Sequence, residues 1–181
     1  YLQIISDESR RLSRLVRRML DVSQLQAIDP LREGKHFDIC ESMRRVLISM
    51  ERKITDRNLD VEADIPEEPI LVLGDKDMIT QVIYNLLENA TKFAREGSTL
   101  YLGVTTIDGK ARVTEGDTIP AEELPLLFER FHKSDKSRSE DKDGYGLGLY
   151  IVKTILEQHK EKISVTSEDG VTAFSFSLAT E

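Results

Sequence analysis

The sequence has a single cysteine, Cys40, among its 181 residues, so an internal disulfide or a multi-cysteine metal site is excluded. It also lacks an excess of positive charge. The formal net charge is −8, whereas proteins that bind nucleic acid usually carry a basic surface. No apolar run approaches the roughly 20 residues that a membrane-spanning helix needs, and no signal-like segment opens the chain. These absences predict a soluble, acidic, intracellular chain.

Apolar and charged residues are both plentiful. Hydrophobic residues make up 39% of the chain and charged residues 32%. This is enough apolar material for a packed core, and it excludes a disordered chain. The length suits one ordinary domain, or one domain with an appended element.

Residues 1–28 contain neither glycine nor proline and predict one amphipathic helix of roughly 40 Å. Apolar side chains recur at steps of three and four residues, with Ser9 as a weak position: Leu2, Ile5, Leu12, Val16 and Met19. Arginines crowd the remaining positions: Arg10, Arg11, Arg14, Arg17 and Arg18. This seam predicts a partner helix, either missing here or supplied by another copy. The alternative is a helix packed on its own domain.

The rest of the chain mixes helices and strands. Helices are predicted at 41–57, 76–94 and 147–157, and strands at 59–63, 70–73, 101–106, 110–113, 163–167 and 173–178. Asp108-Gly109 favours a tight hairpin turn, and the all-polar segment 133–143 predicts a mobile loop. The pattern indicates an α+β fold, a mixed sheet covered by helices. We divide the chain into a helix (1–28), a linker (29–36) and a domain (37–181).

The helix around residue 85 carries two asparagines in its middle, where Asn is a poor helix former. Its predicted buried stripe consists of Ile79, Val82, Ile83, Leu86, Leu87 and Ala90. Asn85, Glu88, Asn89 and Lys92 recur at steps of three and four residues and are predicted to share the other face. Amide oxygens suit a hard cation such as magnesium, and a lysine one turn on suits a phosphate. A plain solvated face is the competing interpretation.

A glycine-rich stretch, GYGLGL at residues 144–149, leads into the next predicted helix. Glycines let the backbone approach an anion, and a helix start offers free N–H groups. The stretch has neither the preceding strand of a dinucleotide-binding unit nor a Walker-type lysine. The stretch therefore predicts phosphate binding, but not in either of those two folds. The alternative interpretation is a flexible linker.

Together these segments resemble the sequence boxes of sensor histidine kinases. QVIYNLLENATKF at residues 81–93 resembles the N box, LFERFHKSD at 127–135 the F box, and GYGLGLYIVK at 144–153 the G2 box. SEDGVTAF at 167–174 looks like the last box, with Val171 where a second glycine is usual. RLSRLV at 11–16 and LDVS at 20–23 look like the second helix of the dimerisation hairpin.

The resemblance implies the two-layer ATP-binding α/β sandwich shared with gyrase, mismatch-repair and chaperone ATPases. It implies that Asn89 binds Mg²⁺, with Asn85 beside it as a possible second ligand, and that Lys92 contacts phosphate. Catalytic roles fall to these three residues. The implied ATP contacts are Asn85, Asn89, Lys92, Phe93, Thr114, Glu115, Gly116, Ile119, Phe128, Phe131, Gly144, Tyr145, Gly146, Leu147, Gly148, Leu149 and Thr172.

Two departures from the family pattern stand out. The G1 box usually reads Asp-x-Gly-x-Gly, and its aspartate accepts a hydrogen bond from the adenine amino group. Aligning Gly116 on the first glycine puts Thr114 at the aspartate position, with Arg112 where an inward apolar residue is expected. Thr114 or Glu115 is the expected substitute. The His-Glu pair of the phosphoacceptor helix is also missing, because none of the chain's histidines, His36, His132 and His159, has that context.

The resemblance therefore implies the ATP-binding core of a sensor histidine kinase. Such a core transfers the ATP γ-phosphoryl group to a histidine, here on a helix absent from the chain, for relay to a response-regulator aspartate. Implied partners are ATP, Mg²⁺, a receiver domain and a second copy of the chain. The implied location is the cytoplasmic part of a membrane-anchored receptor. The alternatives are a degenerate docking module with weak or no nucleotide binding, and an anti-sigma-type serine kinase.

Overall fold

The computed structural model describes residues 2–27, 29–119, 121–122, 125 and 145–180. Its main sheet has five strands in the order β2-β4-β5-β7-β6. These are β2 (Asp60–Asp64), β4 (Thr99–Ile107), β5 (Lys110–Asp117), β6 (Ser164–Glu168) and β7 (Val171–Ala179). β2 runs parallel to β4, and all other neighbours are antiparallel. This mixed sheet confirms the predicted α+β class.

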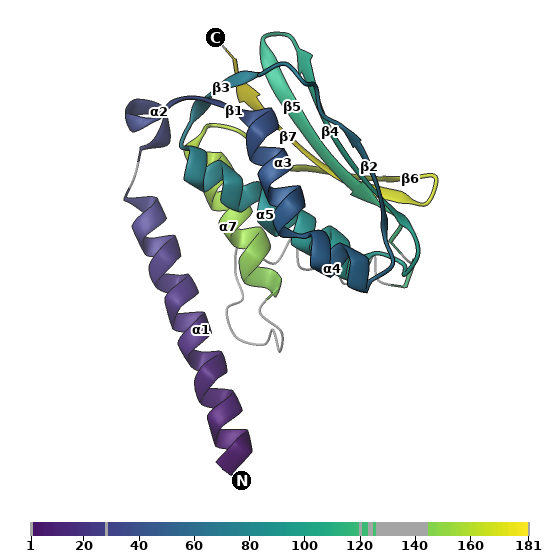
Figure 1. The fold of residues 1–181 in the computed structure, drawn as a ribbon. Helices are drawn as coiled ribbons and strands as arrows, with labels where there is room; N and C mark the ends of the chain where they lie inside the picture. Colours follow the sequence, from purple (N-terminus) through teal and green to yellow (C-terminus); the bar gives the residue numbers. More distant parts are fainter. Residues whose placement is uncertain (1, 28, 120, 123–124, 126–144, 181) are drawn as a thin grey trace.

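Helices cover one face of the sheet (Figure 1). They are α3 (Ile39–Ser49), α4 (Glu51–Asp56), α5 (Lys76–Phe93) and α7 (Tyr145–Gln158). α5 contacts α3, α7 and β5. Its predicted stripe is buried as expected, and the core lies between α5, α7 and the inner face of the sheet.

Local chemistry explains where these elements begin and turn. Asp75 caps α5, because its Oδ1 accepts a hydrogen bond from the Met78 amide (2.9 Å). The hairpin between β4 and β5 turns at Asp108 and Gly109, whose φ angles of 51° and 73° are those of a tight primed turn. Both features confirm the predicted helix and hairpin.

The region before residue 60 differs from the prediction in two ways. The single helix expected at 41–57 is two helices, interrupted at Met50. The Met50 amide donates to carbonyls of the last turn of α3, and no side chain caps the start of α4. Two short elements were not predicted, α2 (Pro30–Glu33) and β1 (Lys35–Asp38). β1 pairs antiparallel with β3 (Leu71–Gly74) as a separate two-stranded sheet.

The N-terminal helix α1 (Leu2–Gln26) extends away from the sheet and contacts α7 (Figure 1). Its apolar seam is exposed: the solvent-exposed fractions of Leu2, Ile5 and Leu12 are 86%, 64% and 63%. Within the described residues, no helix combines the length and hydrophobicity needed to cross a membrane.

Candidate functional site

The two central asparagines of α5 lie inside the structure. Asn85 and Asn89 are both buried, and Asn85 Oδ1 accepts a hydrogen bond from Gln81 Nε2 (3.0 Å). Asn89 Nδ2 is buried without a hydrogen-bond partner among the described residues. Because buried amides in folded proteins are nearly always paired, the Asn89 donor marks a place where an acceptor atom of a ligand, such as a phosphate oxygen, is expected.

The predicted polar face of α5 is divided between two neighbours. Glu88 turns away from the asparagines and accepts a hydrogen bond from Lys53 of α4 (Nζ–Oε1, 2.9 Å). Tyr84 joins this contact, with its hydroxyl 3.2 Å from the same ammonium group. Glu88 is therefore part of the packing of α4 on α5, whereas Asn85 faces α7.

The start of α7 meets Asn85. Asn85 Nδ2 lies 3.5 Å from the carbonyl oxygen of Gly148. A Cβ added at Gly148 would meet no atom of the described residues within 4 Å, so these residues leave open space beside the first turn of α7. The first N–H groups of a helix have no partners within the helix and favour anions. The amide side chain of Asn85 and the start of α7 therefore lie together beside this open space.

The helix begins at Tyr145, two residues earlier than predicted, so Gly146 and Leu147 belong to its first turn. Leu149 is buried in the core. Three of the predicted site residues, Phe128, Phe131 and Gly144, lie outside the described residues, as do His132 and the predicted loop at 133–143.

Strand β5 directs two carboxyl groups toward the helices. Side chains alternate along a strand, and Ala111, Val113, Glu115 and Asp117 are all buried. Arg112 and Thr114 take the opposite face, where Arg112 Nη2 donates to Ser175 Oγ (3.2 Å). Arg112 therefore faces outward, which accounts for the mismatch between this position and the inward apolar residue of the family pattern.

This alternation corrects the predicted G1 register. Thr114 pairs with Ser175 on the outer face, and Gly116 pairs with Ala173, whose Cβ is 3.3 Å from a Cβ built on Gly116. Neither residue faces α5, and Gly116 lies within the strand instead of in a loop. Of the two expected substitutes for the aspartate, only Glu115 faces inward.

Asp117 was not predicted as a site residue, and the structure makes it the strongest additional candidate. Its side chain is 0% exposed, Ser98 Oγ donates to its Oδ1 (3.0 Å), and Oδ2 has no partner among the described residues. Burial raises its pKa to about 7, although the Ser98 hydroxyl, the Thr118 backbone and the positive charge of Arg57 act to lower it. Strand alternation counted from Val113 would have identified this residue.

Two predicted site residues lie near Asp117: Thr172 on the neighbouring strand and Ile119 along the chain. Thr172 pairs with it across β5 and β7, is buried, and donates from Oγ1 to Ser167 Oγ (3.1 Å). Ile119, two residues further along the chain, is buried, as is Phe93 at the end of α5. Lys92, next to Phe93, is partly buried.

Glu115 is the second inward carboxyl group of β5. It is 2% exposed, and both of its oxygens lack a partner among the described residues. Burial raises its pKa well above the usual value for glutamate. A carboxyl group in such surroundings is held in its neutral form.

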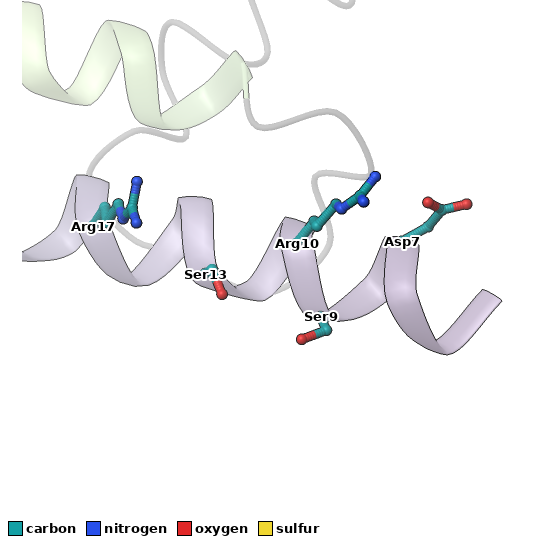
Figure 2. A pocket seen from close by; sticks show the side chains of 5 residues that line it. All are labelled: Asp7, Ser9, Arg10, Ser13 and Arg17. Carbon is teal, nitrogen blue, oxygen red and sulfur yellow. The ribbon is translucent and has the colours of Figure 1, made fainter. Parts of the chain in front are cut away.

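Metal-binding clusters and surface hollows add no second site. The described residues contain no group of three or more His, Cys, Asp or Glu side chains arranged to hold a metal ion. A hollow of about 610 Å³ runs along α1, with Asp7, Arg10 and Arg17 projecting from one side of the helix (Figure 2). Another, of about 450 Å³, includes Arg112 and Ser175. Neither hollow is lined by a residue of the α5–α7 site.

Comparison with known proteins gives a consistent result. A family described as "Histidine kinase-, DNA gyrase B-, and HSP90-like ATPase" matches residues 74–181. Sensor histidine kinase CusS of Escherichia coli (strain K12) is 32% identical over 175 residues, which cover 95% of this chain and 36% of CusS. Sensor protein SrrB of Staphylococcus aureus (strain MRSA252) is 32% identical over 173 residues, covering 93% and 29%. The chain spans about a third of the length of these curated relatives.

Solved structures share the fold. Full-length ShkA, crystallised in complex with AMPPNP, is 25% identical with a TM-score of 0.75, and the match covers 100% of this chain and 39% of ShkA. The nucleotide-free catalytic domain of histidine kinase ThkA is 27% identical with a TM-score of 0.67, covering 81% and 95%. The chain therefore belongs to the histidine kinase-, DNA gyrase B- and HSP90-like ATPase family, as the ATP-binding catalytic core of a sensor histidine kinase.

Proposed function

We propose that this chain binds ATP with Mg²⁺ between α5 and α7 and serves as the phosphoryl-transferring part of a histidine kinase. One observation carries the proposal: Asn85 contacts Gly148 in the first turn of α7, and Asn89, one turn further along α5, is buried with an Nδ2 that has no partner among the described residues. Relatives named as sensor histidine kinases support a kinase activity for the whole protein to which the chain belongs. The acceptor would be a histidine on a helix outside the chain.

The donor set of α5 fits a magnesium ion. Asn89 would supply an amide oxygen, with Asn85 as a possible second ligand, since Mg²⁺ prefers oxygen ligands and is commonly shared with phosphates. Asn89 Nδ2, the atom that lacks a partner among the described residues, is a hydrogen-bond donor and would pair with a phosphate oxygen, while the amide oxygen would face the ion. When bound, the ion would neutralise charge on the transferring phosphoryl group. Lys92 would add a positive charge near the phosphates.

The inner face of β5 would hold the base. We assign the adenine-accepting role to Asp117, because its Oδ2 is buried with no partner in the described part of the chain and Thr172 lies opposite. This position replaces Thr114 in the proposed site, and Gly116 is left out with it. The remaining proposed contacts, retained from the family resemblance, are Phe93, Glu115, Ile119, Phe128, Phe131, Gly144, Tyr145, Gly146, Leu147, Gly148, Leu149 and Thr172.

The whole protein would extend beyond this chain. We propose that residues 1–28 form the second helix of a dimerisation hairpin, residues 29–36 a linker and residues 37–181 the catalytic domain, with a second copy as partner. A structure titled as ThkA in complex with response regulator protein TrrA, 26% identical to this chain, supports a receiver domain as the other partner. Membrane attachment would reside in segments outside the chain, leaving this part in the cytoplasm.

Titration with AMPPNP by calorimetry, with and without Mg²⁺, tests the proposal. The chain should bind the nucleotide more tightly with Mg²⁺. Asn89→Ala should remove that magnesium-dependent gain, whereas Asn89→Asp, which keeps an oxygen ligand, should retain most of it. Thr80→Ala, near the start of the same helix, is the matched control. Unchanged magnesium dependence in Asn89→Ala would refute the metal assignment.

A second pair of variants tests whether Asp117 or Thr114 accepts the hydrogen bond from adenine. Asp117→Ala should weaken binding strongly, because a buried base would lose its hydrogen-bond acceptor. Thr114→Ala should have no effect if the observed register governs binding, and should weaken binding if the motif alignment does. Absence of AMPPNP binding by the unmodified chain would instead favour the docking-module alternative, which the altered G1 box supports.

A further inference from the structure

The turn between α5 and β4, residues 94–98, is fastened to the end of β5. The Arg95 amide donates to the Thr118 carbonyl (3.0 Å), and the Ser98 hydroxyl donates to Asp117 Oδ1 (3.0 Å). Arg57, which follows α4, donates through its guanidinium to the Ala94 carbonyl. The turn therefore connects the end of the N-box helix to the strand end that carries Asp117.

The backbone of Ser98 is held on both sides. Its amide donates to the Arg95 carbonyl (3.0 Å), and its carbonyl accepts from the Asp60 amide at the start of β2 (2.9 Å). With the backbone fixed, only side-chain rotation must be restricted to form the bond to Asp117, so the entropic cost is small. A fixed donor on one carboxylate oxygen determines where the other oxygen points.

We propose that Ser98 is a positioning residue for nucleotide binding, which holds Oδ1 of Asp117 so that the partnerless Oδ2 faces the ligand. The proposal rests on the proposed function, in which Asp117 accepts a hydrogen bond from the amino group of a purine base. Ser98 does not contact the base. It acts through Asp117 alone, and through it the α5–β4 turn becomes part of the base site.

The surroundings of Asp117 make this role measurable by pH. Among the described residues, two charged side chains bear on Asp117. The positive charge of Arg57, after α4, acts on its carboxyl group, and Glu115 lies on the same face of β5. Burial raises the pKa of Asp117 to about 7, and the Ser98 hydrogen bond lowers it. Only the ionised carboxylate can accept from an amino group without donating, so binding should strengthen as the pH rises through this pKa. Loss of the Ser98 hydroxyl should move that transition to higher pH.

The experiment is calorimetric titration of the full chain with AMPPNP and Mg²⁺ from about pH 6 to about pH 9. Ser98→Ala should weaken binding at neutral pH by roughly two- to tenfold, the worth of one hydrogen bond, and shift the midpoint upward by about half a unit to one unit. Ser98→Thr, which keeps the hydroxyl, should restore both values. Glu96→Ala is the control, because Glu96 lies in the same turn and pairs at the surface with Asn58 Nδ2 (3.0 Å).

The outcomes separate this inference from the proposed function. If the unmodified chain binds AMPPNP with a pH dependence that Asp117→Asn abolishes, but Ser98→Ala changes neither affinity nor midpoint, the inference is overturned and the proposed function stands. If Ser98→Ala and Ser98→Thr lose binding equally and both melt at lower temperature, the role of Ser98 is structural and the inference falls. If the unmodified chain binds no AMPPNP at any pH, the proposed function and the inference fall together.

Discussion

Glu115 introduces a carboxyl group into the core without a described partner. Its pKa is raised by burial well above the usual 4.5, so the folded chain keeps the proton that the unfolded chain loses. The contribution of Glu115 to stability is therefore greatest below about pH 4.5 and is lost as the pH rises. A residue that destabilises the fold at neutral pH is typical of a functional site.

Glu115→Met, which has a similar volume and no charged atoms, should raise the free energy of unfolding. We expect a gain of about 1–3 kcal/mol near neutral pH, because no polar group is then buried unpaired. The gain should be smaller at about pH 4, where both states of the parent chain are largely protonated. Urea denaturation at the two pH values measures the difference. A variant less stable than its parent at both values would contradict this account.

At the scale of elements, His159 joins the end of α7 to the start of α5. Its Nδ1 donates to the Ile155 carbonyl (2.8 Å) and its Nε2 accepts from the Asp75 amide (3.1 Å), which defines a neutral imidazole. Gly74 leaves room for the ring, since a Cβ there would lie 2.7 Å from Nε2. Burial lowers the pKa of His159, opposed by the Ile155 hydrogen bond and by the charges of Asp75 and Glu161.

His159→Leu should destabilise the fold by about 1–3 kcal/mol above pH 7, since it leaves the Asp75 amide unpaired. The folded state binds fewer protons here than the unfolded state, whose pKa is near 6.5. The stabilisation is therefore complete above that pH and declines as the pH falls below it. Denaturation curves at about pH 7.5 and about pH 5 should show the gap between variant and parent narrowing on acidification. A constant gap would mean that His159 stabilises only by packing.

Periodic elements were predictable from the sequence, and non-local ones were not. The stripe of α5 and the Asp108-Gly109 turn depend on neighbouring residues, and both were predicted with nearly correct boundaries. Strand β1 has four residues and exists because Phe37 pairs with Val72, a partner that no local pattern reveals. Met50 interrupts a run whose apolar spacing alone indicates a continuous helix.

The candidate site shows the same division. Asn85 and Asn89 stood out because asparagine is unusual in the middle of a helix. The partner of Asn85 at Gly148 is 63 residues away, and only the resemblance to a family brought the two segments together. For β5, aligning a glycine motif gave the wrong phase, because the pleat of the strand is set by burial of Val113 and Ala111. The alignment therefore did not single out Asp117, the residue to which we assign the adenine-accepting role in our proposal.

At the scale of the whole molecule, the exposed seam of α1 should govern association between copies. Ile5→Asp with Leu12→Asp removes two apolar side chains that are 64% and 63% exposed. We expect this variant to abolish concentration-dependent association in sedimentation experiments while the affinity for AMPPNP stays unchanged, because both side chains are exposed and neither belongs to the proposed site. Gln3→Asp, on the opposite side of the helix by its spacing, is the control. A parent chain that stays monomeric at all concentrations would contradict association through this seam alone.

The chain alone should bind ATP yet form no acid-labile phosphohistidine. Phosphoryl transfer needs an acceptor nitrogen held at roughly 3–3.5 Å from the reacting phosphorus. Both nitrogens of His159 are engaged and its side chain is 3% exposed. His36 lies in β1 opposite Leu73, on a different sheet from Asp117. His132 lies outside the described residues, and the family resemblance gives it no acceptor role.

Labelling with γ-³²P-ATP, followed by acid and alkali treatment, distinguishes phosphohistidine from phosphoserine. The unmodified chain should remain unlabelled. Adding a hairpin segment with a His-Glu pair should produce acid-labile label on the added histidine, because that segment supplies both the acceptor and the second half of the α1 seam. Robust acid-labile labelling of the chain by itself, lost in His132→Ala, would instead make His132 the acceptor and would require a reaction contained within this one domain.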